Sequence, residues 1–92
     1  MAERSAYRFL PDYAVPPGAI LAEYLEALGM TQAELAARTG LAKKTINGII
    51  RGNAAITPAT ALKFERALGR PAQFWSSLER QYQEDLVRLA DI

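Results

Sequence analysis

Hydrophobic residues recur three and four positions apart along most of the chain, which is the spacing that places side chains on one face of an α-helix. Glycine and proline interrupt this pattern at intervals, so each helix except the last is expected to be short. The pattern predicts an all-α domain of five helices, over about 17–28, 31–39, 43–51, 57–68 and 71–90. Residues 1–16 lack the periodicity, and we interpret them as an N-terminal arm that precedes one domain of residues 17–92.

Local signals mark the ends of the central helices. Thr31 and Glu34 have the spacing of a capping box, in which each side chain bonds to the backbone N–H of the other residue. Gly40 can adopt the positive φ that ends a helix and turns the chain sharply. Thr57 followed by Pro58 is typical of a helix start. These signals predict two short helices joined by a tight turn, with a further helix after them.

The second of these short helices has two distinct faces. Ile46, Ile49 and Ile50 form a stripe that is expected to be buried. The outward positions are Lys43, Lys44, Asn47 and Arg51. Leu41 is expected to fill the corner between the helices. Two short helices with this turn are typical of a helix-turn-helix, which inserts the second helix into the major groove of DNA. We also expect Leu28 and Leu62 on the apolar faces of their helices.

Residues 31–52 closely resemble the helix-turn-helix of lambda-repressor-like (Xre-type) regulators. Segments 15–21, 56–62, 67–69 and 74–75 resemble the HigA (VapI) antitoxin branch of that family, so the resemblance covers about residues 13–90. It implies a five-helix lambda-repressor-like domain that binds a palindromic operator in duplex DNA as a homodimer. It also implies that the chain neutralises a HigB-type ribonuclease toxin and represses its own operon.

The resemblance also implies roles for individual residues. In the family pattern, the positions of Lys43, Lys44, Asn47 and Gly48 face the bases, and those of Gln32 and Thr45 contact the DNA backbone. Arg51 at the end of the helix and Asn53 in the segment after it are expected to contribute as well. The expected DNA-binding set is therefore Gln32, Lys43, Lys44, Thr45, Asn47, Gly48, Arg51 and Asn53.

Three departures from the family pattern leave alternatives open. Ala42 replaces the usual Ser or Thr cap of the second helix, Gly48 replaces a side chain that reaches a base, and Asn53 and Ala54 replace basic residues. One alternative is a protein-interaction module whose degenerate helix-turn-helix no longer reads an operator. Another is the N-terminal part of an ImmA/IrrE-type metallopeptidase regulator, which residues 11–14 resemble.

The last helix carries large apolar residues at helical spacing. A helix of about five turns is too long for a small domain to cover completely, and an exposed apolar stripe usually marks a partner surface. We therefore predict a two-fold dimer through this helix, with burial in the core as the alternative. The predicted dimerisation residues are Trp75, Leu78, Tyr82, Leu86 and Leu89.

Composition narrows the possible functions. The 92 residues contain no histidine and no cysteine, which removes the usual general base, the commonest zinc ligand and any thiol nucleophile. We therefore predict a protein that is not an enzyme and needs no metal or cofactor. Residues 35–64 contain five basic residues and no acidic one, which favours an anionic partner such as DNA. No apolar run is long enough to span a membrane, and we predict a cytoplasmic protein.

Overall fold

The computed structural model describes residues 13–91, and these residues form five helices and no strand. The helices are α2 (Pro17–Leu28), α3 (Gln32–Thr39), α4 (Lys43–Ile50), α5 (Pro58–Leu68) and α6 (Ala72–Ala90). The predicted all-α class is confirmed. Most of the predicted N-terminal arm, residues 1–12, lies outside the described residues. In the described part, no helix is both long and apolar enough to cross a membrane.

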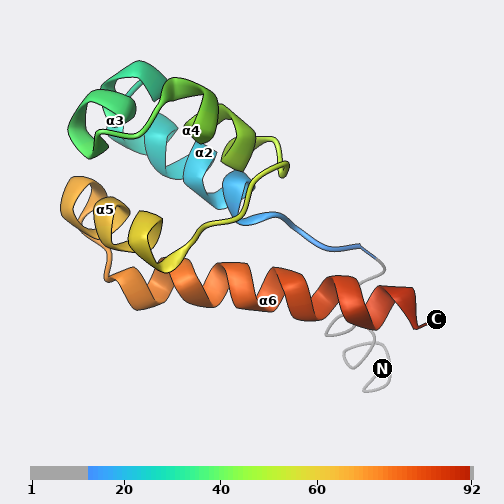
Figure 1. Ribbon diagram of the computed structural model, residues 1–92. Coiled ribbons are helices and arrows are strands. Elements are labelled where there is room, and N and C mark those ends of the chain that lie inside the picture. The colour runs from blue at the N-terminus through green and yellow to red at the C-terminus, as the bar shows by residue number, and fades with distance from the viewer. Residues whose placement is uncertain (1–12, 92) are drawn as a thin grey trace, which may run out of the picture.

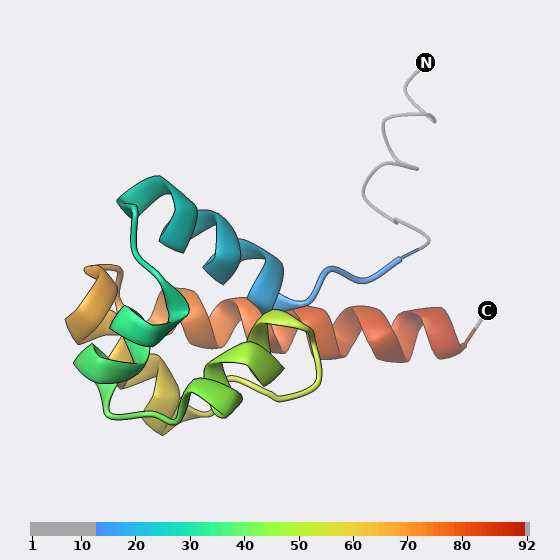
Figure 2. The same cartoon turned by 90° about the horizontal axis from the view of Figure 1, so that it is seen from above.

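The long helix α6 organises the molecule. Helices α5 and α2 pack against its N-terminal half, α3 and α4 lie beyond them, and its C-terminal half projects past all four (Figure 1). The view from above shows the same projection, with the extended segment before α2 running beside the projecting half (Figure 2). The principal extents of 46 × 24 × 20 Å reflect this elongation. One end of the molecule is therefore a packed helical body, and the other end is a single helix.

The predicted helix ends are confirmed at their caps. The backbone N–H of Glu34 donates to Thr31 Oγ1 at 3.0 Å, and the backbone N–H of Thr31 donates to Glu34 Oε1 at 2.9 Å. This second bond lowers the pKa of the Glu34 carboxyl, since it stabilises the charged form. Thr57 Oγ1 accepts from the N–H of Thr60 at 3.2 Å, and Gly40 ends α3 with φ of 76°.

Trp75 lies at the centre of the hydrophobic core, which corrects its predicted role in dimerisation. Its side chain is 0% exposed, and its ring contacts the rings of Phe64, Phe74 and Tyr24 at centroid distances of 5.4, 4.9 and 5.3 Å. The prediction was wrong because α2 and α5 pack on the N-terminal half of α6. The remaining core residues come from α2, α3, α4, α5 and the segment before α5: Leu21, Leu25, Leu35, Ile46, Ile49, Ile56 and Ala61.

Two residues that we expected on apolar faces are exposed instead. Leu28 is 53% exposed because it is the last residue of α2, where the helix leaves the packed body. Leu62 is 47% exposed. Successive residues of a helix are about 100° apart, so Leu62 points away from the buried Ala61 and Phe64. Both predictions were wrong because helical spacing alone does not specify where the neighbouring helices lie.

Helices α2 and α4 approach each other closely at Gly18. A Cβ atom at this position would lie 1.9 Å from the carbonyl oxygen of Ile49 and 2.5 Å from the Cα of Ile50. Only glycine, which lacks a Cβ, permits this approach. The first turn of α2 therefore rests directly on the backbone at the end of α4.

Candidate nucleic-acid interface

Side-chain and backbone hydrogen bonds hold the turn between α3 and α4. Thr39 Oγ1 donates to the carbonyl of Leu35 at 2.7 Å and accepts from the backbone N–H of Leu41 at 3.2 Å. The N–H of Gly40 donates to the carbonyl of Ala36 at 2.8 Å. Leu41 packs against the core, as expected for a residue that fills the corner. Helices α3 and α4 are therefore held in a defined relative orientation.

Helix α4 is buried on one face and exposed on the other. Ile46 and Ile49 are buried, and Ile50 is half-buried. Lys43, Lys44, Thr45 and Arg51 are exposed. No side chain caps the start of α4 at Ala42, as its sequence predicted. The exposed face of α4 thus carries three cations, and the N-terminus of the helix has no side-chain cap.

An amide pair connects this face to α3. Asn47 Nδ2 donates to Gln32 Oε1 at 3.3 Å. The bond uses one polar atom of each amide and leaves Asn47 Oδ1 and Gln32 Nε2 for a ligand. These two predicted contact residues, 15 positions apart in the sequence, therefore form one hydrogen-bonding unit across the two helices.

Most of the predicted DNA-binding residues surround one depression. The depression has a volume of about 470 Å³ and lies on the outward side of α4. It is lined by Lys44, Thr45, Asn47, Gly48, Arg51, Asn53 and Ala54. Six of the eight predicted residues thus come together here, and Gln32 is joined to them through Asn47. Lys43 is exposed at the start of α4 and does not line the depression. Ala54 was not among the predicted residues, because an alanine offers no contact signal in a sequence.

The loop after α4 folds back onto that helix. Gly52 has φ of 82°, and the N–H groups of Asn53 and Ala54 donate to the carbonyl of Gly48 at 2.8 and 3.2 Å. These bonds complete the last turn of the helix and bring the loop against its outward side. The rim of the depression is therefore formed partly by α4 and partly by this loop.

Glu79 of α6 holds the other end of the loop. Its Oε1 accepts from the backbone N–H of Ile56 at 2.9 Å, and its Oε2 accepts from Gln83 Nε2 at 2.7 Å. This structural role of Glu79 was not predicted from the sequence. The i, i+4 spacing of Glu79 and Gln83 is visible in the sequence, but the contact with residue 56 depends on the tertiary fold.

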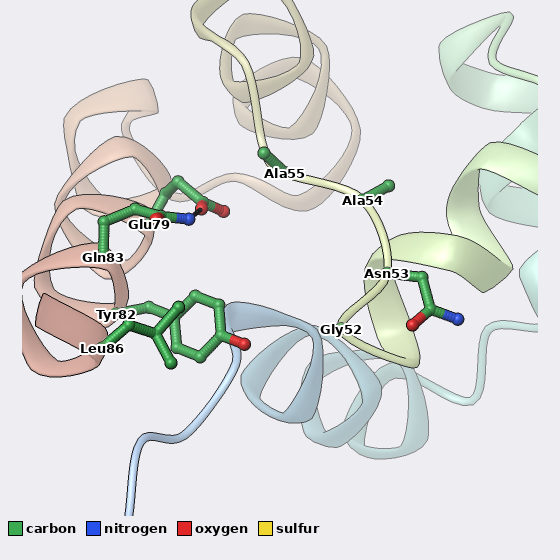
Figure 3. A pocket seen from close by; sticks show the side chains of 8 residues that line it. All are labelled: Gly52, Asn53, Ala54, Ala55, Glu79, Tyr82, Gln83 and Leu86. Atoms are coloured by element: carbon green, nitrogen blue, oxygen red, sulfur yellow. Dashed lines mark hydrogen bonds between the residues drawn. The ribbon is translucent and has the colours of Figure 1, made fainter. Parts of the chain in front are cut away.

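A small pocket of about 210 Å³ separates the loop from α6. Figure 3 shows Tyr82 and Leu86 approaching the loop from α6, while Asn53 points away from both of them. Tyr82 is half-buried and Leu86 is 40% exposed. Of the other predicted dimerisation residues, Leu78 packs against the core and Leu89 is half-buried. The remaining apolar surface of α6 is therefore concentrated on its projecting half.

The exposed face of α4 carries positive charge, whereas charged residues on α6 form ion pairs. The exposed cations Lys43, Lys44 and Arg51 lie on α4 and at its end. On α6, Glu84 pairs with Arg80 at 3.7 Å, and Asp85 pairs with Arg88 at 2.6 Å. These pairs lie within one helix and partly neutralise the acids. The face of α4 is consequently the positive surface to which an anionic polymer is attracted.

A helix-turn-helix family model matches residues 21–75. Virulence-associated protein I of Dichelobacter nodosus is 37% identical over 70 residues, which are 75% of this chain and 65% of that protein. An addiction module antidote protein of the HigA family from Coxiella burnetii has a TM-score of 0.77 at 31% identity, over 79% of this chain and 80% of its own. The Pseudomonas aeruginosa antitoxin HigA, solved with the higBA promoter, has a TM-score of 0.80 at 29% identity, over 86% and 87% respectively. The chain thus spans about two thirds of the length of the Dichelobacter protein.

Proposed function

The chain belongs to the helix-turn-helix family, and we propose that it is a sequence-specific DNA-binding transcriptional regulator that acts as a HigA-type antitoxin. The single observation that carries the DNA-binding role is the depression on α4, which six predicted contact residues line. The similarity to an antitoxin solved with its promoter supports the same interpretation. In this proposal the chain acts by binding and catalyses no reaction, and it works in the cytoplasm.

Helix α4 is the recognition helix of this proposal. Its exposed face enters the major groove, where Lys44 and the amide of Asn47 can bond to base edges. Gln32 begins α3 and is positioned to bond to a phosphate through its free Nε2. Arg51, at the other end of α4, binds the backbone further along the groove. A protein bound across a promoter in this way represses transcription because it blocks access for the polymerase.

A homodimer is the second part of the proposal. The projecting half of α6 and the segment before α2 form a groove of about 300 Å³, which Tyr13, Val15, Ile20, Leu78 and Tyr82 line with mainly apolar atoms. Two copies joined through this end place two α4 helices on one face of DNA, about 34–36 Å apart, which matches the half-sites of a palindrome. Light scattering tests this arrangement. Val15→Glu, which places a charge in this groove at an exposed position, should be a folded monomer. A wild-type protein that is monomeric at tens of micromolar would contradict the proposed dimer.

Binding of a HigB-type ribonuclease toxin is the third part. It is supported by the similarity to antitoxins and not by any surface feature of this chain. Co-expression with a small ribonuclease encoded beside its gene should relieve the growth arrest that the toxin causes. Persistent arrest, despite expression of the folded protein, would contradict the antitoxin role but not DNA binding.

Salt-dependent binding to DNA tests the core of the proposal. The probe is a fluorescent duplex that contains the DNA upstream of the protein's own coding sequence, and the control is a scrambled duplex of equal composition. About six phosphate contacts give a log–log slope near −5, because each contact releases about 0.9 counterion. Affinity should therefore fall about a thousandfold between 50 and 200 mM salt. Absence of binding at 50 mM salt would favour the alternative of a protein-interaction module.

A further inference from the structure

Gly48 is the one glycine of the chain whose presence the structure does not explain by packing or by backbone conformation. Four of the six glycines have positive φ, and Gly18 lies against the backbone of α4. Gly48 lies inside α4 with helical φ, and among residues 13–91 an added Cβ would meet only the Cβ of Ala54, at 3.4 Å. That distance is an ordinary van der Waals contact. Because glycine lowers helix stability relative to alanine, its presence here calls for a reason outside the folded chain.

The position of Gly48 in the depression supplies such a reason. Lys44 precedes it by four residues and Arg51 follows it by three, so all three share one side of α4. Ala54 reaches the same place from the loop, where two backbone hydrogen bonds to the Gly48 carbonyl hold it. The lining of the depression thus includes Gly48 and Ala54 together with the polar side chains of Thr45, Asn47 and Asn53, and Lys44 and Arg51 supply its cations. A side chain at position 48 would fill part of this space.

The chemistry of Gly48 and Ala54 selects the part of DNA that fits against them. Beyond their backbone, Gly48 and Ala54 contribute only a hydrogen and a methyl group, so they offer no donor to a phosphate or to a base edge. The apolar group that projects into the major groove of duplex DNA is the C5-methyl of thymine. The flanking cations match the negative charge of the DNA around such a methyl group.

We propose that Gly48 and Ala54 form a seat for the C5-methyl group of one thymine in each half-site of the operator. Lys44 and Arg51 hold the DNA on either side of this seat. The inference rests on the proposed DNA-binding function and makes Gly48 a residue that determines specificity through the space it leaves. A cytosine at the same place leaves the seat empty, because it lacks the methyl group.

Deoxyuridine substitution tests the seat, because deoxyuridine keeps the hydrogen-bonding edge of thymidine and lacks only the methyl group. The probe is a consensus duplex that the wild-type protein selects from a random-sequence library, with its thymines replaced one at a time. Burial of one methyl contributes about 0.8 kcal/mol, which corresponds to about a fourfold change in affinity. One thymine per half-site should show this loss, and substitution in both half-sites should cost about sixteenfold.

Two variants connect the lost methyl to this depression. Gly48→Leu and Ala54→Leu fill the space from the helix and from the loop, and in both the fourfold preference for thymine should disappear. Ala27→Leu adds the same side chain at an exposed position of α2 and should keep the preference. Circular dichroism establishes that each variant is folded, and either filling variant is sufficient if the other does not fold.

The outcomes separate the seat from the function on which it rests. If the selected consensus contains no thymine whose methyl loss weakens binding, the seat does not exist, although the protein still recognises an operator. If the sensitive thymine remains sensitive in a folded filling variant, its methyl is bound elsewhere and the inference is again wrong. If the library yields no consensus at all, the proposed sequence-specific function fails, and the seat fails with it.

Discussion

Replacing Gly18 with alanine places a methyl group inside the contact between α2 and α4. The new Cβ would lie 1.9 Å from the carbonyl oxygen of Ile49, whereas an ordinary contact begins at 3.4 Å. The two helices must therefore move apart by about 1.5 Å. The obstacle is backbone on both sides, so no rotamer change relieves it.

The expected cost of Gly18→Ala depends on this displacement. Added atoms in a packed interior cost about 1–3 kcal/mol, and a clash with backbone belongs at the upper end of that range. Alanine returns up to about 1 kcal/mol through its better helix propensity. The net loss of about 2 kcal/mol should lower the melting temperature of a domain of this size by roughly 8–16 °C. Thermal unfolding followed by circular dichroism at 222 nm measures this change.

Gly48→Ala is the matched control, since it makes the same chemical change in the other helix of this contact. Its Cβ meets only Ala54 at 3.4 Å, so alanine should raise stability by about 0.5–1 kcal/mol. The two substitutions should thus shift the melting temperature in opposite directions. A Gly18→Ala protein that melts within 2 °C of wild type would refute the close approach of α2 and α4.

Three further predictions address binding and stability at other sites. Lys44→Ala should weaken the binding free energy by about 1–3 kcal/mol on a cognate duplex and by less on random DNA, whereas Arg51→Ala should weaken binding to the two duplexes equally. Fluorescence anisotropy titrations with the two duplexes measure these affinities, and an equal loss on both for Lys44→Ala would exclude a base contact. Glu79→Ala should destabilise the fold by about 1–2 kcal/mol in urea unfolding, because it leaves the backbone N–H of the buried Ile56 without its acceptor, while Glu84→Ala, in an exposed ion pair, should stay within about 0.5 kcal/mol. The pKa of Glu34 is lowered in the folded state, so the carboxylate stabilises the fold above its ordinary pKa of 4.5, and this stabilisation is lost as the pH falls through the folded-state pKa. The wild-type protein should therefore lose more stability than Glu34→Gln between pH 6 and pH 2.

The helix boundaries could be predicted from the sequence because their causes are local. The capping box of Thr31 and Glu34, the positive φ of Gly40 and the Thr57 cap each involve residues within four positions of one another. The exposed face of α4 could be predicted from helical spacing for the same reason. Six residues of the predicted site consequently lie around one depression, although the depression itself was not predicted.

Errors arose where the answer depends on how helices cross. Trp75 belongs to the core because α2 and α5 pack against the N-terminal half of α6, and helical spacing gives no sign of which half is covered. The close packing of Gly18 on α4 and the bond from Ile56 to Glu79 join segments 23 or more residues apart. Such contacts leave no periodic signal in the sequence. The only visible sign of the packing of α2 on α4 was a glycine in the first turn of α2.

These distant contacts connect the two ends of the molecule. The Gly48 carbonyl fixes the start of the loop after α4, and Glu79 of α6 fixes the N–H of Ile56 at its end. Only a few residues separate these anchors, so α4 cannot shift along α6 without breaking one of them. In the proposed dimer α6 contacts the second copy, and the distance between the two recognition helices therefore depends on Glu79. Glu79→Ala, which removes the acceptor of the Ile56 N–H, should accordingly weaken binding to a palindrome with two half-sites more than binding to a single half-site, because a single half-site does not sense that distance. Equal losses on both duplexes would mean that the anchor affects the stability of each copy and not the spacing between the two.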